Sequence, residues 1–233
     1  MADPLALARD LVERARAGDL VSDARDRLAA LDPAALEAAL IDDARRTAFW
    51  LNVYNGAVRV RLLADPAAFR HRWRFFARAA IVVAGHRLSP NTIEHGMLRR
   101  SSPVIGLGYV RNPLPSRFER RMRVGRLDAR IHFALNCGAR SCPPIAAWDP
   151  VTLDADLERA TAAYLRAEST RTSDGGEIRV PRLLLWYRGD FGGRRGIMTL
   201  LKRHGLAGPE EEPRVRYASY DWTMDVSGPA GSP

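Results

Sequence analysis

Apolar residues recur at helical spacing through the first third of the chain. This spacing predicts helices over residues 3–17, 22–31, 33–41 and 43–63, with a further helix from residue 66 to about residue 78. Asp-Pro pairs at 32–33 and 65–66 separate these segments, since proline fits the first turn of a helix and not its interior. The N-terminal part is therefore expected to be helical.

The period changes after residue 78. Residues 79–84 are a short apolar run rich in β-branched side chains, which predicts a buried strand. A turn at 85–87 precedes a short helix that opens at Ser89-Pro90. Residues 101–129 contain several prolines and glycines, so we expect a loop there.

Strands and helices mix in the rest of the chain. Further strands are expected at 130–136, 177–180 and 214–220, and helices at 153–168 and 194–205, while 183–187 fits either. The predicted fold is α+β, with N-terminal helices packed on a small, mostly antiparallel sheet. We expect one domain over residues 1–233, with a flexible tail at about 226–233.

Composition and charge narrow the class of protein. A chain of 233 residues with 46% hydrophobic residues suits a single folded domain. The net charge is +9, which raises nucleic acid as a partner. Lys202 is the single lysine, however, so the basic residues are almost all arginine. A chain-wide preference for arginine indicates a coding bias more than a phosphate-binding surface, and nucleic acid is disfavoured.

The N-terminus and the apolar runs bear on location. Asp3 and regularly spaced charges break the first twenty residues, so no basic segment followed by an apolar core is present. No run reaches the roughly 18 apolar residues of a membrane span. We therefore expect a cytoplasmic protein without a membrane span.

The two cysteines, Cys137 and Cys142, lie in one block with His132. Four interpretations stay open: a nucleophilic cysteine, a buried structural thiol, a disulfide, or a metal site shared with His132. The spacing of the three residues matches no standard metal site, so we expect no metal and no cofactor.

Cys137 is well placed for a nucleophile because it ends a predicted strand before a glycine turn. The backbone N–H groups of Gly138 and Ala139 would then be available to stabilise an oxyanion. His132 precedes Cys137 by an odd number of positions, so on a regular strand the two side chains point to opposite faces. This favours His95, or else His86, as the general base.

Three polar residues complete the candidate site. Glu94 is adjacent to His95, and the two can face one site only if their helix is distorted, because successive helix residues diverge by about 100°. Asn52 and Asn55 share one face of an apolar helix. Their buried amides either tie that helix to a neighbouring loop, which we favour, or orient a catalytic imidazole.

Five blocks carry a family resemblance, namely FWLNVYNG (49–56), GHRLSPNTIEHGMLR (85–99), RIHFALNCGARSCPPI (130–145), WYRGDFG (186–192) and YDW (220–222). Over residues 45–225 the chain resembles the family called domain of unknown function 547. That family is distantly similar to papain-like and transglutaminase-like thiol enzymes. The resemblance implies a papain-like arrangement, circularly permuted because His95 precedes Cys137.

The resemblance also weights the two cysteines differently. The family's cysteine block falls on Cys137 and Cys142, and its IEH block on Glu94 and His95. Plant relatives often keep the first cysteine and have serine at the second. This implies that Cys137 and His95 matter most, and it weakens the case for a required disulfide or for a metal site at His132.

We therefore expect a cysteine-dependent hydrolase or acyltransferase that acts on an amide or ester. Cys137 would attack, His95 would act as base, and Glu94, Asn52 or Asn55 would orient the imidazole.

Two alternatives belong to other classes. One is a non-catalytic binding module that uses the same pocket, with a basic loop contacting an acidic partner through Arg111, Arg117, Arg120 and Arg121. The other is a thiol redox protein, for which Cys137 and Cys142 must bridge.

Overall fold

The N-terminal half is helical, as predicted. The computed structural model describes residues 3–225, so the predicted tail at 226–233 lies outside the described residues. Its first four helices are α1 (Pro4–Ala17), α2 (Ser22–Ala29), α3 (Pro33–Ala39) and α4 (Asp43–Ala64). The side chains of Asp3, Asp32 and Asp42 each accept a hydrogen bond from a backbone N–H in the first turn of the helix that follows, which fixes where α1, α3 and α4 begin.

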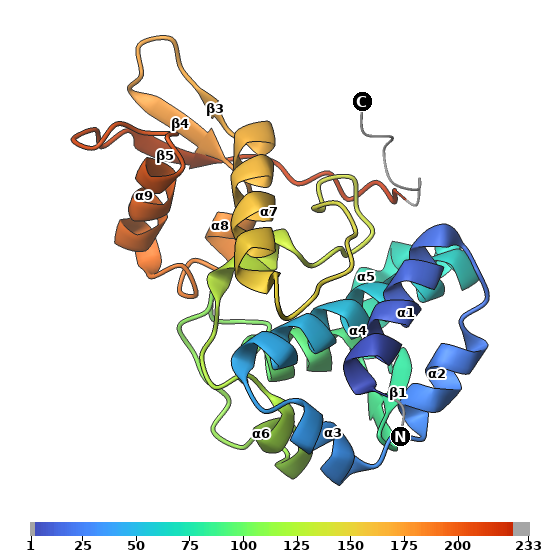
Figure 1. Ribbon diagram of the computed structural model, residues 1–233. Coiled ribbons are helices and arrows are strands. Elements are labelled where there is room, and N and C mark those ends of the chain that lie inside the picture. Colours follow the sequence, from blue (N-terminus) through green and yellow to red (C-terminus); the bar gives the residue numbers. More distant parts are fainter. Residues whose placement is uncertain (1–2, 226–233) are drawn as a thin grey trace.

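Helix α4 is the centre of this half and is buried on almost every side. Helix α1 lies along it (Figure 1). The two helices lie close together at Gly56, where a β-carbon would lie 2.7 Å from Leu11 Cγ. Glycine in a helix costs about 1 kcal/mol relative to alanine, and here it permits the close packing of α1 on α4.

A small hairpin follows the helices. The chain passes through η1 (Pro66–His71) and α5 (Arg72–Ala77) into the antiparallel pair β1 (Ile81–Val83) and β2 (His86–Leu88). The expected strand near 79–84 is thus present. The expected turn at 85–87 includes most of a second strand.

The C-terminal part forms a second unit (Figure 1). Its elements are α7 (Leu153–Glu168), β3 (Thr170–Arg171), β4 (Glu177–Val180), α8 (Leu183–Trp186), α9 (Gly193–Arg203) and β5 (Arg214–Tyr217). Strand β4 pairs antiparallel with β3 and parallel with β5. The fold is α+β, as predicted, with its strands divided between two small sheets.

Two segments differ from prediction. Residues 130–136 are not a strand, because η3 (Ala129–Phe133) is a 3₁₀-helix that the Asp128 side chain caps by accepting from Arg130 N at 2.9 Å. The expected loop at 101–129 contains α6 (Arg117–Met122), where Ser116 caps the first turn. Both helices are short, and their local caps outweigh the apolar alternation and the loop composition.

Buried apolar side chains form two clusters. One surrounds α4 and includes Ile131, while the other lies between the three-stranded sheet, α7 and α9 and includes Phe133. The short η3 therefore connects the two clusters. None of the helices within residues 3–225 is long and apolar enough to cross a membrane.

Candidate functional site

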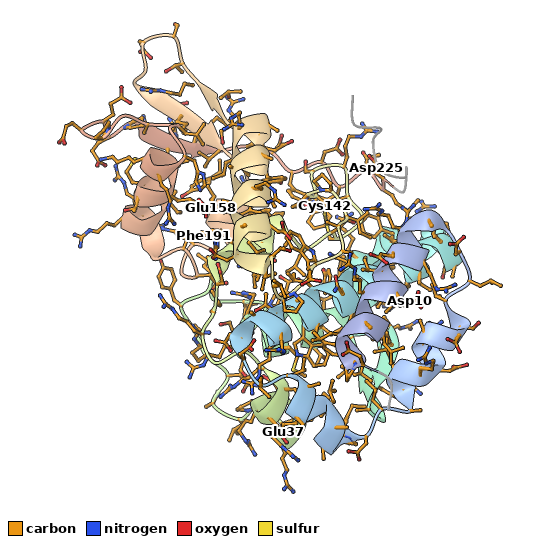
Figure 2. The ribbon with its side chains drawn as sticks, in the orientation of Figure 1. Asp10, Glu37, Cys142, Glu158, Phe191 and Asp225 are labelled. Carbon is orange, nitrogen blue, oxygen red and sulfur yellow. A yellow bond between two sulfur atoms is a disulfide. The ribbon has the colours of Figure 1, made fainter. Side chains whose placement is uncertain are left out.

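A cavity of about 180 Å³ lies where the two clusters meet. It is lined by residues of α4, the 92–98 helix, α8, the 220–222 segment and the loop that contains Cys137 and Cys142, called the cysteine loop below. Figure 2 shows Cys142 on the loop between the helical half and the C-terminal unit. The cavity brings together five residues singled out from the sequence: Glu94, His95, His132, Cys137 and Cys142.

Glu94 and His95 both face the cavity because their helix is distorted. The η2 segment (Thr92–Leu98) is a π-helix. Its ladder contains bonds that span five residues, from Arg99 N to Glu94 O at 2.8 Å and from Ser101 N to Gly96 O at 2.9 Å. Such segments are rare and occur frequently at functional sites. The π-helix is therefore the distortion that we expected if Glu94 and His95 were to face one site.

The imidazole of His95 is bound by an arginine. Arg99 Nη1 lies 2.6 Å from His95 Nδ1, and because a guanidinium only donates, Nδ1 accepts and the ring proton is on Nε2. That Nε2 lies 4.0 Å from Glu94 Oε1. Burial lowers the pKa of His95, although the Glu94 charge opposes this. The lone pair that a general base needs is therefore engaged with Arg99.

His132 has a free lone pair. Its Nε2 lies 2.9 Å from Asp190 Oδ2, while its Nδ1 is buried with no hydrogen-bond partner among residues 3–225. The ring stacks on Tyr187 with the ring centres 3.7 Å apart. Burial lowers the pKa of His132 against the effect of Asp190. The expectation that His132 faces away from Cys137 assumed a regular strand, which is absent here, and both residues line the cavity.

Asp190 is hydrogen-bonded to His132 directly and is linked to His95 through Arg99. Its Oδ2 accepts from Arg99 Nε at 2.6 Å as well as from His132, and neither the Asp190 nor the Arg99 side chain is appreciably exposed. Burial alone would raise the pKa of Asp190, but the bonds from His132 and Arg99 outweigh it and lower that pKa. Asp190 is thus an anion that orients His132.

Glu94 is a second buried anion. Tyr187 Oη donates to Glu94 Oε1 at 2.6 Å. Burial by itself raises the pKa of the Glu94 carboxyl, but the neighbouring His95, the bond from Tyr187 and the charges of His132 and Arg99 lower it below its ordinary value. The cavity therefore has an ionised carboxylate in its wall.

The two cysteines form a disulfide. Tyr220 Oη contacts both sulfurs, at 3.4 Å from Cys137 Sγ and 3.1 Å from Cys142 Sγ. Burial raises the pKa of the Tyr220 hydroxyl, so it stays protonated and able to donate. Within the described part of the chain, no group of three or more His, Cys, Asp or Glu residues could hold a metal ion.

The predicted amides are structural. Asn55 Nδ2 donates to Ala134 O at 3.0 Å, and its Oδ1 accepts from Asn136 N at 2.9 Å. Asn52 holds Trp148 in the same way, with both bonds at 2.8 Å. Because loop backbone occupies both amides, their role is to tie α4 to the loops, which was the role we favoured, and not to orient an imidazole.

Three further candidates do not contribute as expected. The Gly138 N–H donates to Asn136 Oδ1 at 3.0 Å, so it is not free for an oxyanion. Ala139 is buried and pairs with Met224 in a β-bridge. His86 is exposed on β2, stacks on Phe118 with ring centres 3.9 Å apart, and is not among the residues that line the cavity.

Three of the four arginines expected to contact an acidic partner, Arg111, Arg120 and Arg121, are hydrogen-bonded within the fold. Arg111 Nη1 donates to Arg99 O at 2.9 Å and to Ser102 Oγ at 2.6 Å. Arg121 pairs with Glu37, and Arg120 donates to Pro115 O at 2.6 Å. Arg121 is therefore ion-paired, whereas Arg111 and Arg120 bond to neutral oxygens and keep their positive charge.

Four site residues escaped the sequence analysis. Tyr187, Asp190 and Tyr220 belong to blocks that carried the family resemblance, as does Arg99, yet no local pattern marked them as functional. Membership of those blocks was the available signal. Their roles depend on contacts between distant parts of the chain.

Comparisons with known proteins place the chain in a family. No curated protein matches it, and no solved structure matches it. A family model described as "Protein of unknown function, DUF547" matches residues 39–165, just over half of the chain. Asp190 and Tyr220 lie beyond the matched range. On this match, the chain belongs to the DUF547 family of proteins of unknown function.

Proposed function

We propose that this protein is a cysteine-dependent hydrolase or acyltransferase that acts on an amide or ester, with Cys137 as the nucleophile and His132 as the base. The observation behind this proposal is that Cys137 shares a cavity with an imidazole oriented by a buried carboxylate, the His132–Asp190 pair. A nucleophile, a base and a group that orients the base are the parts that thiol catalysis needs.

The proposed chemistry begins with reduction of the Cys137–Cys142 disulfide by an external dithiol, which is itself oxidised to a disulfide, because a disulfide sulfur is not a thiolate and does not attack a carbonyl. His132 Nδ1 then takes the Cys137 proton, and the thiolate attacks the substrate carbonyl to form an S–C bond. The leaving group departs with the proton from His132, and water or another acceptor cleaves the thioester.

His132 suits the role of base better than His95, which the sequence favoured. Arg99 occupies Nδ1 of His95, while Nδ1 of His132 has no partner within residues 3–225. Asp190 fixes the opposite nitrogen of His132 and stabilises the imidazolium that forms. Tyr220 Oη lies close enough to Cys137 Sγ to donate to a thiolate.

The test compares alkylation of Cys137 by iodoacetamide as a function of pH. In the Cys142→Ser variant, which cannot form the disulfide, we expect Cys137 to react with an apparent pKa below the roughly 8.5 of a free thiol. His132→Gln should raise this pKa, and His95→Gln should change it less. An apparent pKa at or above that of a free thiol in Cys142→Ser, or equal effects of the two histidine variants, would contradict the proposal.

The disulfide itself favours a second candidate, a thiol redox protein. There the Cys137–Cys142 disulfide would accept two electrons from a dithiol substrate, giving two cysteine thiols and an oxidised substrate. This function needs both cysteines, whereas hydrolysis needs only Cys137. Loss of both dithiol oxidation and acylation in Cys142→Ser would favour the redox protein. Acylation of Cys137 by p-nitrophenyl acetate in that variant would favour the hydrolase.

A further inference from the structure

Among residues 3–225, Glu94 has no arginine or lysine as an ion-pair partner. The Asp190 carboxylate pairs with the Arg99 guanidinium, so that cation is already taken. The basic side chain beside Glu94 is His95, whose Nε2 lies 4.0 Å from Glu94 Oε1. Because His95 Nδ1 accepts a hydrogen bond from Arg99, that ring has no room for a second proton and gives Glu94 no full positive charge.

The bond that Glu94 accepts from Tyr187 moderates the negative charge of Glu94 without cancelling it, because a phenol hydroxyl is neutral. A buried carboxylate without a cationic partner is costly. The Glu94 side chain is 10% exposed, and the residue lines the cavity. A cation inside the cavity could therefore reach it and supply the missing charge.

The walls of the cavity also favour a cation. Trp186, Tyr220 and Trp222 form a cluster whose ring centres lie 4.6 to 5.7 Å apart, and all three line the cavity. Aromatic faces attract cations through the ring quadrupole. Exposed Arg72, which is not among the lining residues, already places its guanidinium 4.7 Å from the centre of the Trp222 ring.

From this geometry we infer that the cavity is a binding site for an organic ammonium group, with Glu94 as its counter-ion and Trp186, Tyr220 and Trp222 as its aromatic wall. The cavity volume of about 180 Å³ corresponds to roughly six water molecules, which suits a short alkylamine chain. One consequence rests on the proposed function: the amide or ester substrate of the hydrolase has a positively charged amine near the bond that is cleaved.

Binding can be measured without any thiol chemistry. The oxidised 233-residue chain, whose cysteines are disulfide-bonded, is titrated with n-butylammonium chloride, and the response is followed by calorimetry and by tryptophan fluorescence. Neutral 1-butanol and sodium chloride serve as the matched ligands. We expect saturable binding of butylammonium, about tenfold or more tighter than that of butanol, since hydrogen bonds to charged groups are the stronger ones.

Two variants locate the site. Glu94→Gln removes the charge and should weaken butylammonium binding about tenfold or more. Glu13→Gln removes an exposed carboxylate on α1 and should leave binding unchanged. The comparison of butylammonium with butanol on the unsubstituted chain requires no variant, so it decides the case even if Glu94→Gln does not fold.

Equal affinity for butylammonium and butanol, or no binding of butylammonium at millimolar concentration, would overturn the ammonium site. So would unchanged binding by a folded Glu94→Gln variant. These results are independent of Cys137 reactivity, which is tested on the reduced thiol. An ammonium site with an unreactive Cys137 would refute the hydrolase alone, and a reactive Cys137 without ammonium binding would refute the substrate class alone.

Discussion

Arg99 Nε lies 2.6 Å from Asp190 Oδ2, joining residues that are 91 positions apart in the sequence, and both side chains are almost fully buried. The same guanidinium binds His95, and the same carboxylate binds His132. This ion pair therefore links the π-helix to the C-terminal unit and determines which histidine keeps a free lone pair.

Removing the guanidinium should destabilise the fold strongly. Arg99→Met leaves the Asp190 carboxylate buried without a cation, and loss of one partner of a buried pair costs about 3–5 kcal/mol. Urea unfolding measures this change. The double variant Arg99→Met/Asp190→Asn should recover part of the loss, because it removes both charges; a double variant as unstable as the sum of the two single variants would show that the ion pair contributes no coupling.

The two asparagines of α4 separate stability from reactivity. Asn55→Ala leaves the Ala134 carbonyl and the Asn136 N–H without their partner, and we expect a loss of about 2–4 kcal/mol in the free energy of unfolding. It should also alter the alkylation rate of Cys137 in the reduced protein, since Asn136 adjoins that cysteine.

Asn52→Ala is the matched control, because it breaks two equivalent bonds to Trp148. A similar loss of stability is expected, with little change in Cys137 alkylation. If both variants changed the alkylation rate equally, the effect would reflect general destabilisation and not the position of the cysteine loop.

A glycine on the 101–116 loop should tolerate no side chain. Gly108 has φ +85°, and a β-carbon there would lie 2.5 Å from Asp190 Oδ1. Gly108→Ala combines this clash with a left-handed backbone that alone costs about 1–2 kcal/mol. Gly85 has φ +77° with nothing within 4 Å of a β-carbon, so Gly85→Ala should show the backbone cost alone. Equal destabilisation of the two variants in urea unfolding would contradict the contact with Asp190.

Stability should fall as the pH drops below about 6.5. Burial lowers the pKa of His95 and of His132 from the ordinary value of 6.5, so the unfolded chain binds more protons than the folded one in this range. The stability from these neutral histidines is complete above the unfolded pKa and is lost progressively toward the lower folded values. Urea unfolding from about pH 8 to about pH 5 measures this dependence.

His132→Gln should flatten that pH dependence, because it removes one of the buried groups that must be kept neutral. His86→Gln, on the exposed side of β2, should leave it unchanged. A profile as steep in His132→Gln as in the unsubstituted protein would mean that the loss at low pH arises elsewhere.

Local signals predicted most of the helical half. Asp3, Asp32 and Asp42 precede apolar positions at helical spacing, and caps of this kind act within one turn of chain. The apolar alternation at 130–136 predicted a strand, which is wrong. The segment η3 is a short 3₁₀-helix that is capped by Asp128. Periodicity cannot separate a strand from so short a helix.

The site was predicted in part. Glu94, His95 and Cys137, which the cavity brings together, could be selected from the sequence because cysteine and histidine are recognisable by their chemistry. Asp190 and Arg99 could not, because their importance lies in a pair formed across the fold. The proposed base changed from His95 to His132 for the same reason. The hydrogen bonds from Arg99 to His95 and between His132 and Asp190 determine which imidazole nitrogen is free, and the sequence alone did not reveal them.

The π-helix at Thr92–Leu98 is equivalent to one extra residue inserted into an α-helical turn. Deleting a single residue from it would allow an ordinary α-helix, in which neighbouring side chains diverge by about 100°. We expect Glu94 and His95 then to diverge and no longer to share the cavity. In this segment a change of chain length is therefore more damaging than most changes of side chain.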